Sequence, residues 1–141
     1  MVNSNIPNME RSDYIKERLV QLIEKGNNDV VDELFSIEYV AHAGDKVYWG
    51  HPFLKKYVRQ VRRAIPDIKL KKMEVLSQSE DRLTSQRFYT GTHSSSMMGI
   101  PASKKRVSWH EMVVTRFEDG KIVEEWIVSD LAFQLIRKLN A

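Results

Sequence analysis

The spacing of apolar side chains divides the sequence into two parts. In the first part, apolar residues recur every three to four positions, which predicts amphipathic helices over residues 12–25, 29–35 and 52–65. A short extended segment is expected at residues 39–42, between the second and third helices. Residues 1–11 in front of these elements are polar and contain a proline, so we expect a flexible tail there.

In the second part the apolar period changes from about 3.6 to about 2, the period of a half-buried strand. This alternation predicts strands near residues 68–78, 82–92, 106–117 and 122–129, followed by a final helix at 130–139. Helices that come first and strands that follow in hairpin order are typical of the α+β class with an antiparallel sheet. We therefore expect an α+β fold.

The last predicted hairpin indicates which side chains share a face of the sheet. A type I turn at Glu118-Asp119, with Gly120 in the left-handed bulge position, pairs odd-numbered residues with odd-numbered residues. One face then carries Trp109, Glu111, Val113, Thr115, Val123, Glu125 and Ile127. The other face carries His110, Met112, Val114, Ile122, Trp126 and Val128. Both faces are apolar, so we expect one to meet the helices and the other a second subunit, whereas a two-residue turn at Asp119-Gly120 would change this pairing.

Composition narrows the class of protein. The chain has 141 residues, of which 42% are hydrophobic and 29% charged, which suits a single globular domain over residues 12–141. It has no cysteine and no apolar run of the roughly 18 residues that a membrane span needs, so we expect a cytoplasmic protein with no membrane contact. Residues 55–72 are strongly basic, but no nucleic-acid motif accompanies them, so a solvated helix face is favoured over a nucleic-acid partner.

Several short motifs in the second half of the chain resemble one known family. They are Gly91-Thr92-His93, Met98-Gly99-Ile100-Pro101, Lys105-Arg106-Val107-Ser108-Trp109, the run Arg116-Phe117-Glu118-Asp119-Gly120-Lys121-Ile122-Val123-Glu124-Glu125-Trp126, and Asp130. With the order of the predicted elements, they make the sequence similar to the SnoaL-like polyketide cyclase, or ester cyclase, family of the nuclear-transport-factor-2-like superfamily. The resemblance implies a cone-shaped α+β fold, in which a curved antiparallel sheet wraps around the N-terminal helices and a C-terminal helix follows.

The resemblance also implies a pocket between the concave sheet and the helices. In the cyclases of this family an aspartate on the last strand is the general base, and a polar residue is common on the strand before it. The shared Asp-Gly-Lys-Ile turn aligns these positions with Ile127 and Val113, whose side chains cannot exchange a proton. Glu111 lies on the same predicted face, where burial would raise its pKa as a general base requires. The alternative is a glutamate that pairs with a basic residue or faces water.

Other candidate residues surround the expected pocket. His42 ends the first extended segment and is the candidate acid or oxyanion partner of Glu111, with a surface or packing role as the alternative. Six residues are candidates for substrate binding, unless they fill an ordinary core: Trp49, His93, Met98, Trp109, Val113 and Ile127. No spacing typical of metal ligands occurs, so we expect no metal site.

Two hypotheses of function follow. The first is a cofactor-independent enzyme that moves a proton in a hydrophobic carbonyl compound and so drives cyclisation, isomerisation or elimination. The second is a non-catalytic ligand-binding or dimerisation module of the same fold, which the aliphatic residues Val113 and Ile127 favour. The expected partners are a hydrophobic small molecule and a second copy of the chain, bound through the outer sheet face. A cavity beside Glu111 would favour the enzyme, and a cone closed by side chains would favour the module.

Overall fold

The computed structural model describes residues 10–141, which form four α-helices and one six-stranded sheet. The helices are α1 (Arg11–Leu19), continued by a π-helical turn η1 (Val20–Glu24), α2 (Asp29–Leu34), α3 (Gly50–Ala64) and α4 (Leu131–Leu139). The strands are β1 (Phe35–Ala43), β2 (Lys46–Trp49), β3 (Lys69–Gln78), β4 (Arg82–Thr92), β5 (Arg106–Glu118) and β6 (Lys121–Ser129). The expected α+β class is confirmed. Within this part of the chain, no helix has the length and apolar character that crossing a membrane requires.

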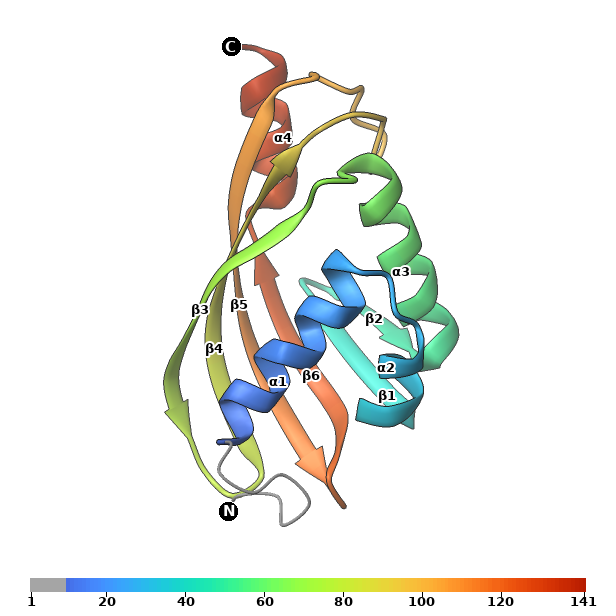
Figure 1. Ribbon diagram of the computed structural model, residues 1–141, viewed down its shortest axis with the longest axis vertical. Helices are drawn as coiled ribbons and strands as arrows, with labels where there is room; N and C mark the ends of the chain where they lie inside the picture. The colour runs from blue at the N-terminus through green and yellow to red at the C-terminus, as the bar shows by residue number, and fades with distance from the viewer. Residues whose placement is uncertain (1–9) are drawn as a thin grey trace.

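The sheet has the strand order β2-β1-β6-β5-β4-β3. Neighbouring strands are antiparallel except β1 and β6, which run parallel. Figure 1 shows a curved sheet with α1, α2 and α3 on one side, while α4 lies beside β5 near the C-terminus. We call the face toward α1, α2 and α3 the inner face and the opposite one the outer face.

The core fills the space between the three N-terminal helices and the inner face. The helices bury apolar residues at the predicted spacing: Ile15, Leu19, Leu22, Leu54, Val58 and Val61. The strands contribute every second residue, because successive side chains of a strand point to opposite faces. Leu83 on β4 and Val107 on β5 meet the helices in this way, and both are fully buried.

Two strands go beyond what the pattern predicts. β1 is longer than the extended segment expected at residues 39–42, and β2 has no counterpart among the predicted elements. Gly44, with φ of +66°, lies in the turn between them, a conformation that glycine adopts without steric cost. β1 is then held by its parallel pairing with β6, where Ala41 lies opposite Glu125. Such a pairing joins segments that are far apart in the chain, so the local sequence pattern does not predict it.

The β5–β6 hairpin confirms the predicted pairing at its centre and corrects it near the turn. Val113 lies opposite Ile127, so odd-numbered residues share the inner face there, as expected. The turn itself has two residues, because Asp119 and Gly120 both have positive φ, 52° and 76°. A register shift between Arg116 and Phe117 accommodates one extra residue of β6 and restores the odd-to-odd pairing beyond it.

This bulge moves Ile122 to the face opposite the predicted one. Ile122 lies opposite Phe117 and is fully buried, although the predicted turn placed it on the outer face. The prediction is wrong for this residue because it lies between the turn and the bulge, where the register is offset by one position.

Arg11 ties the start of α1 to the turn between β3 and β4. Its guanidinium donates hydrogen bonds to the backbone carbonyls of Ser79 and Glu80, both at 2.6 Å, and lies 4.6 Å from the ring centroid of Phe117. Helix α1 therefore already begins at the last residue of the expected tail. Residues 1–9 of that tail lie outside the described residues.

Gly91 sits where β4 passes directly against the turn that ends α3. A Cβ at this position would overlap the side chain of Ile65 and lie 3.2 Å from a carboxylate oxygen of Asp67. That carboxylate in turn accepts hydrogen bonds from the backbone N–H of Thr92 at 2.6 Å and from its hydroxyl at 2.8 Å. The close approach of the two segments therefore requires a glycine at position 91.

We expect Gly91→Ala to lower the free energy of unfolding by about 1–3 kcal/mol, because the added methyl group overpacks a region in which Ile65 is fully buried. Urea unfolding followed by circular dichroism would measure the loss. Gln86→Ala, on the outer face of the same strand, is the matched control and should change stability by less than about 0.5 kcal/mol. Equal losses in the two variants would contradict the close packing at Gly91.

Candidate active site

Three charged side chains lie on the inner face, on three neighbouring strands. Arg87 comes from β4, Glu111 from β5 and Glu125 from β6. Arg87 and Glu111 are direct cross-strand partners, and Glu125 lies opposite Thr115 further along β5. Arg87 and Glu125 are each only 5% exposed. Charges buried to this degree need partners, because removing them from water is costly.

The carboxylate of Glu125 is fully engaged. The hydroxyl of Tyr39 donates a hydrogen bond to its Oε1 at 2.8 Å, and the hydroxyl of Thr115 donates one to its Oε2 at 2.6 Å. Nη2 of Arg87 lies 3.6 Å from the same Oε2. Burial and the neighbouring Glu125 carboxylate raise the pKa of Tyr39, so its phenol stays a neutral donor. Glu125 is therefore a structural carboxylate that joins strands β1, β4, β5 and β6.

Glu111 is held more loosely than Glu125. Its side chain is partly buried, and it makes no ion pair within the part of the chain that the structure describes. Burial, together with the Glu125 charge, raises the pKa of Glu111, and these effects prevail over the opposing influence of the Arg87 charge and of the Ser129 and Trp109 side chains. A carboxylate that is desolvated and has a raised pKa is well suited to accept a proton near neutral pH.

Two tyrosines complete the surroundings of Glu111. Tyr57 comes from α3 and Tyr89 from β4, and burial together with the negative charge of Glu111 raises the pKa of both. Their hydroxyls therefore stay protonated at neutral pH. The ring of Tyr89 stacks on that of Trp109 with 5.5 Å between centroids, which gives this side of the inner face an aromatic wall.

Several buried donors on the inner face lack a hydrogen-bond partner among the described residues. They are the hydroxyl of Ser85, Nε and Nη2 of Arg87, and the indole Nε1 of Trp109. All three residues alternate with outer-face residues along β4 and β5, so they face the same side as Glu111. A buried donor without an acceptor costs about 1–3 kcal/mol. The inner face is therefore suited to receive acceptor atoms, such as the oxygens of a ligand or of water.

The structure brings together four of the eight residues singled out from the sequence. Glu111 shares the inner face with Trp109, Val113 and Ile127. Trp109 and Val113 are buried, at 2% and 1% exposure, and Ile127 is partly buried against the core. The apolar side chains therefore adjoin the polar cluster of Arg87, Glu111 and Glu125 on the inner face.

His42 does not join this group, so its expected partnership with Glu111 is wrong. The structure places it on the outer face, where its Nε2 lies 2.6 Å from Oε2 of Glu124 and its ring stacks on Trp126 at 5.3 Å between centroids. The reason is the alternation along β1, because Tyr39 and Ala41 point inward and His42 therefore points outward.

Three expected pocket residues also lie away from the inner cluster. Trp49 ends β2 and is 67% exposed, and Met98 is 56% exposed in the loop after β4. His93 is fully buried, but six residues beyond Arg87, which is about 20 Å along an extended strand. Its backbone pairs with Lys104 and Lys105, which closes the base of the loop. These three residues were assigned from the sequence on their type and neighbourhood, and the fold separates them from Glu111.

Arg87, Tyr57 and Tyr89 are members of the cluster to which the sequence pattern gave no role. Arg87 does carry a signal, because it alternates along β4 with Leu83 and Ser85, both of them buried. A charged residue in such a buried series indicates a buried partner. Its identity as Glu125, on a strand that is not adjacent to β4, follows only from the folded sheet.

The cluster combines one loosely held carboxylate with several donors. Its own side chains can move a proton and stabilise negative charge that develops on an oxygen atom. Among residues 10–141, no three histidine, aspartate or glutamate side chains gather as metal ligands would.

The sequence matches the family model described as SnoaL-like polyketide cyclase over residues 14–136. No curated protein matches it. Among solved structures, it is similar to AclR, a proposed hydroxylase from Streptomyces galilaeus, with 27% identity and a TM-score of 0.72 over 91% of this chain and 95% of that one.

Two further solved structures share the fold at lower identity. IdmH, a proposed polyketide cyclase from Streptomyces antibioticus, is 22% identical with a TM-score of 0.76 over 94% of this chain and 100% of that one. TsrD from Streptomyces laurentii is 22% identical with a TM-score of 0.78 over 95% of this chain and 99% of that one. These two similarities establish the cone-shaped fold and carry no statement about the reaction.

We expect Glu111→Gln to gain stability relative to the parent protein as the pH rises. Burial raises the folded-state pKa of Glu111 above its unfolded value of about 4.3. The parent therefore loses stability as the pH rises from that value through the folded pKa, whereas the neutral glutamine does not. Thermal melts of both proteins between about pH 4 and pH 8 would show the difference growing in favour of the variant.

Glu124→Gln is the matched control, with the opposite sign. Hydrogen bonds from His42 and Arg116 lower the pKa of Glu124. Its charge therefore stabilises the folded protein above the unfolded pKa, and this stabilisation is lost as the pH falls through the folded pKa. As the pH rises from about 3 to about 5, the parent gains this stabilisation and Glu124→Gln does not, so the variant should become less stable relative to the parent. The same pH trend in both variants would contradict the burial of Glu111.

Proposed function

The chain belongs to the SnoaL-like polyketide cyclase family, and on that premise we propose that it is an enzyme that moves a proton in a small molecule without a cofactor. Its substrate is a hydrophobic carbonyl compound that lies between the inner face and the helices. The observation that carries the proposal is the contrast between the two inner carboxylates. Glu125 is committed to Tyr39, Thr115 and Arg87, whereas Glu111 has a raised pKa and no ion pair among the described residues.

In the proposed reaction Glu111 is the general base. Its carboxylate takes a proton from the carbon next to the carbonyl group. The electron pair of the broken C–H bond forms a C=C bond, and the π electrons of the carbonyl group move onto its oxygen. The resulting enolate oxygen accepts hydrogen bonds from Nε of Arg87 and Nε1 of Trp109, two buried donors that have no hydrogen-bond partner among the described residues. The outcomes open to the enolate are cyclisation, isomerisation and elimination. In cyclisation the enolate carbon attacks a second carbonyl of the same molecule, and Glu111 returns its proton to the new alkoxide. In isomerisation Glu111 returns the proton to another carbon of a conjugated enolate. In elimination the enolate expels a leaving group from the β-carbon, and Glu111 protonates that group.

The register of β5 and β6 supports Glu111 as a substitute for the family's aspartate. The family resemblance aligns the base with Ile127, which lies opposite Val113. Glu111 lies opposite Ser129, one residue pair further along the same face. Diagonal neighbours of this kind are about 7–8 Å apart, and a glutamate is one methylene longer than an aspartate. The Glu111 carboxylate can therefore reach the space that an aspartate at position 127 would occupy.

We expect Glu111→Gln to lose the proton-transfer activity while it keeps ligand binding, because glutamine fills the same volume but cannot accept the proton. The readout is enzyme-dependent deuterium uptake at the α-carbon of 2-tetralone in D2O, followed by NMR. The uptake rate should fall by at least about 100-fold in Glu111→Gln. In the parent it should rise with pH, with a midpoint above the ordinary range of a glutamate, because the base must be deprotonated.

Glu124→Gln is the control for this experiment, because Glu124 lies on the outer face beside His42. It should keep the parental rate. A parental rate in Glu111→Gln as well would assign the base to another residue.

A second candidate function is a non-catalytic binding or dimerisation module of the same fold. It is favoured by the aliphatic side chains of Val113 and Ile127 and by an apolar patch on the outer face of β5 and β6. Ligand binding that persists without deuterium uptake in the parent would support this function over the enzyme.

We also propose that the chain forms a homodimer through this outer patch, defined as Met112, Val114, Trp126 and Val128. Met112 is 44% and Val128 75% exposed. Exposed apolar patches of this kind mark interaction sites. The cytoplasmic location expected from the sequence stays a prediction.

Sedimentation at micromolar concentration should give the mass of a dimer. Val128→Glu should raise the dimer dissociation constant at least about tenfold, because a charge would be buried in the interface without a partner. Leu76→Glu, at an exposed apolar position on β3, is the control and should leave the dimer intact. A monomeric parent, or equal effects of both variants, would rule out this interface.

A further inference from the structure

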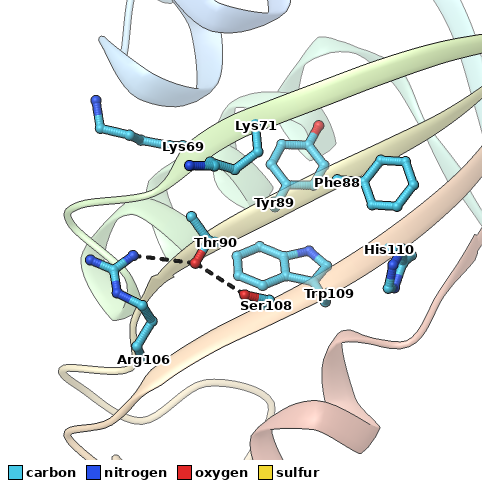
Figure 2. Close-up of a pocket in the computed structure, with 9 residues that line it drawn as sticks. All are labelled: Lys69, Lys71, Phe88, Tyr89, Thr90, Arg106, Ser108, Trp109 and His110. Atoms are coloured by element: carbon cyan, nitrogen blue, oxygen red, sulfur yellow. Dashed lines mark hydrogen bonds between the residues drawn. The ribbon is translucent and has the colours of Figure 1, made fainter.

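A hollow of about 660 Å³ lies against β3, β4 and β5 and is lined mainly by outer-face residues to which the proposed reaction gives no role. Two neighbouring cross-strand rows of outer-face side chains run through this region. One row is Lys69, Thr90 and Ser108, and the other is Lys72, Phe88 and His110. Figure 2 shows the lining residues, with the lysines on the β3 side and Arg106 reaching Thr90 from β5. The hollow therefore combines a cationic part with an aromatic part.

Positive side chains outnumber negative ones around the cationic part of the hollow. Lys69 and Lys71 are exposed and make no ion pair among the described residues. Nη2 of Arg106 lies 4.0 Å from Oδ2 of Asp67, but both oxygens of that carboxylate already accept hydrogen bonds from Thr92. Three cations around one hollow repel each other and attract an anion.

The guanidinium of Arg106 is largely exposed, and one hydrogen bond orients it toward the hollow. Its Nη1 donates a hydrogen bond to the hydroxyl oxygen of Thr90 at 3.2 Å, and the hydroxyl of Ser108 donates to the same oxygen at 3.2 Å. The hydroxyl of Thr90 in turn donates to the backbone carbonyl of Val107 at 3.1 Å. Because Thr90 is buried, it is a fixed anchor. A positioned arginine loses less conformational freedom when it binds an anion.

The aromatic part lies in the next row. Phe88 is partly exposed, and its ring meets that of His110 edge to face, with 4.7 Å between centroids. Nζ of Lys72 lies 5.7 Å from the Phe88 centroid, and Nδ1 of His110 lies 3.6 Å from Oδ2 of Asp130. These contacts leave an apolar ring surface beside the cations, to which a planar ligand can bind by stacking.

We propose that this hollow binds a small aromatic molecule that carries a negatively charged group, with its ring against Phe88 and its charge among Lys69, Lys71 and Arg106. The anionic group is a phosphate monoester or a carboxylate, both of which an arginine binds through parallel hydrogen bonds. Phe88, Thr90, Ser108 and His110 project to the face opposite Glu111, although Tyr89 and Trp109 of the inner face also line the hollow. The proposed ligand is held by the outer-face side chains, so this second site does not rest on the proposed reaction.

The test is an NMR titration of the 15N-labelled full-length chain with phenyl phosphate, benzoate, inorganic phosphate and phenol. We expect amide shifts over residues 69–72, 88–90 and 106–110. One of the two aromatic anions should bind at least about fivefold more tightly than both inorganic phosphate and phenol, and affinity should fall as NaCl is added. Tighter binding of phenyl phosphate identifies a phosphate ester, and tighter binding of benzoate identifies a carboxylate.

Variants at exposed positions locate the charge. Lys69→Gln and Arg106→Gln should each weaken the tighter ligand at least about fivefold, whereas Lys46→Gln on β2, which removes the same charge elsewhere, should not. Phe88→Leu should weaken the aromatic anions and leave inorganic phosphate unchanged. Glu111→Gln should leave the affinity for the tighter ligand unchanged. If the anion bound in the inner cluster instead, removing the negative charge of Glu111 would tighten its binding. Amide shifts absent from the hollow, or equal losses in Lys46→Gln and Arg106→Gln, would overturn the proposal.

Discussion

The buried carboxylate of Glu125 joins four strands of the sheet, and the inner face depends on it. Its oxygens accept hydrogen bonds from Tyr39 on β1 and Thr115 on β5, and Arg87 on β4 supplies the opposing charge. Removing one member of such a buried pair costs about 3–5 kcal/mol, because the other charge stays in the core without compensation. The same group adds a side-chain tie to β1, which enters the sheet through a parallel pairing with β6 and packs Phe35, Tyr39 and Ala41 into the core.

The arrangement of one arginine between two carboxylates also sets the properties of Glu111. Arg87 lies within salt-bridge distance of Glu125 and leaves Glu111 without an ion pair among the described residues. The desolvation of Glu111 is therefore only partly offset, and its pKa is raised. This carboxylate costs the fold stability once it is ionised, and that unfavourable state is what makes it able to accept a proton. Stability and chemistry are thus assigned to different acids of one cluster.

The pleat of the strands separates the inner cluster from the outer surfaces. Glu124 and Glu125 are adjacent in the sequence, yet Glu124 binds His42 on the outer face and Glu125 binds Tyr39 on the inner face. On β5, Glu111 faces the helices and its neighbour His110 faces the hollow. One sheet therefore offers a helix-covered face for the proposed proton transfer and an exposed face for the proposed ligand and the proposed second subunit, because each strand alternates between them.

The sequence alone determined the helices, the last four strands and much of the inner face. Apolar periodicity placed the helices and the last four strands, and alternation along β5 placed Trp109, Glu111 and Val113 together, since both patterns reflect which neighbouring side chains must leave water. The tertiary structure decided the rest. The outward direction of His42, the pairing of Arg87 with Glu125 and the inward turn of Ile122 depend on the β1–β6 pairing, the strand order and one bulge. Each of these is set by contacts between residues far apart in the chain or by a one-residue shift of register, and neither changes the local pattern of apolar and polar residues.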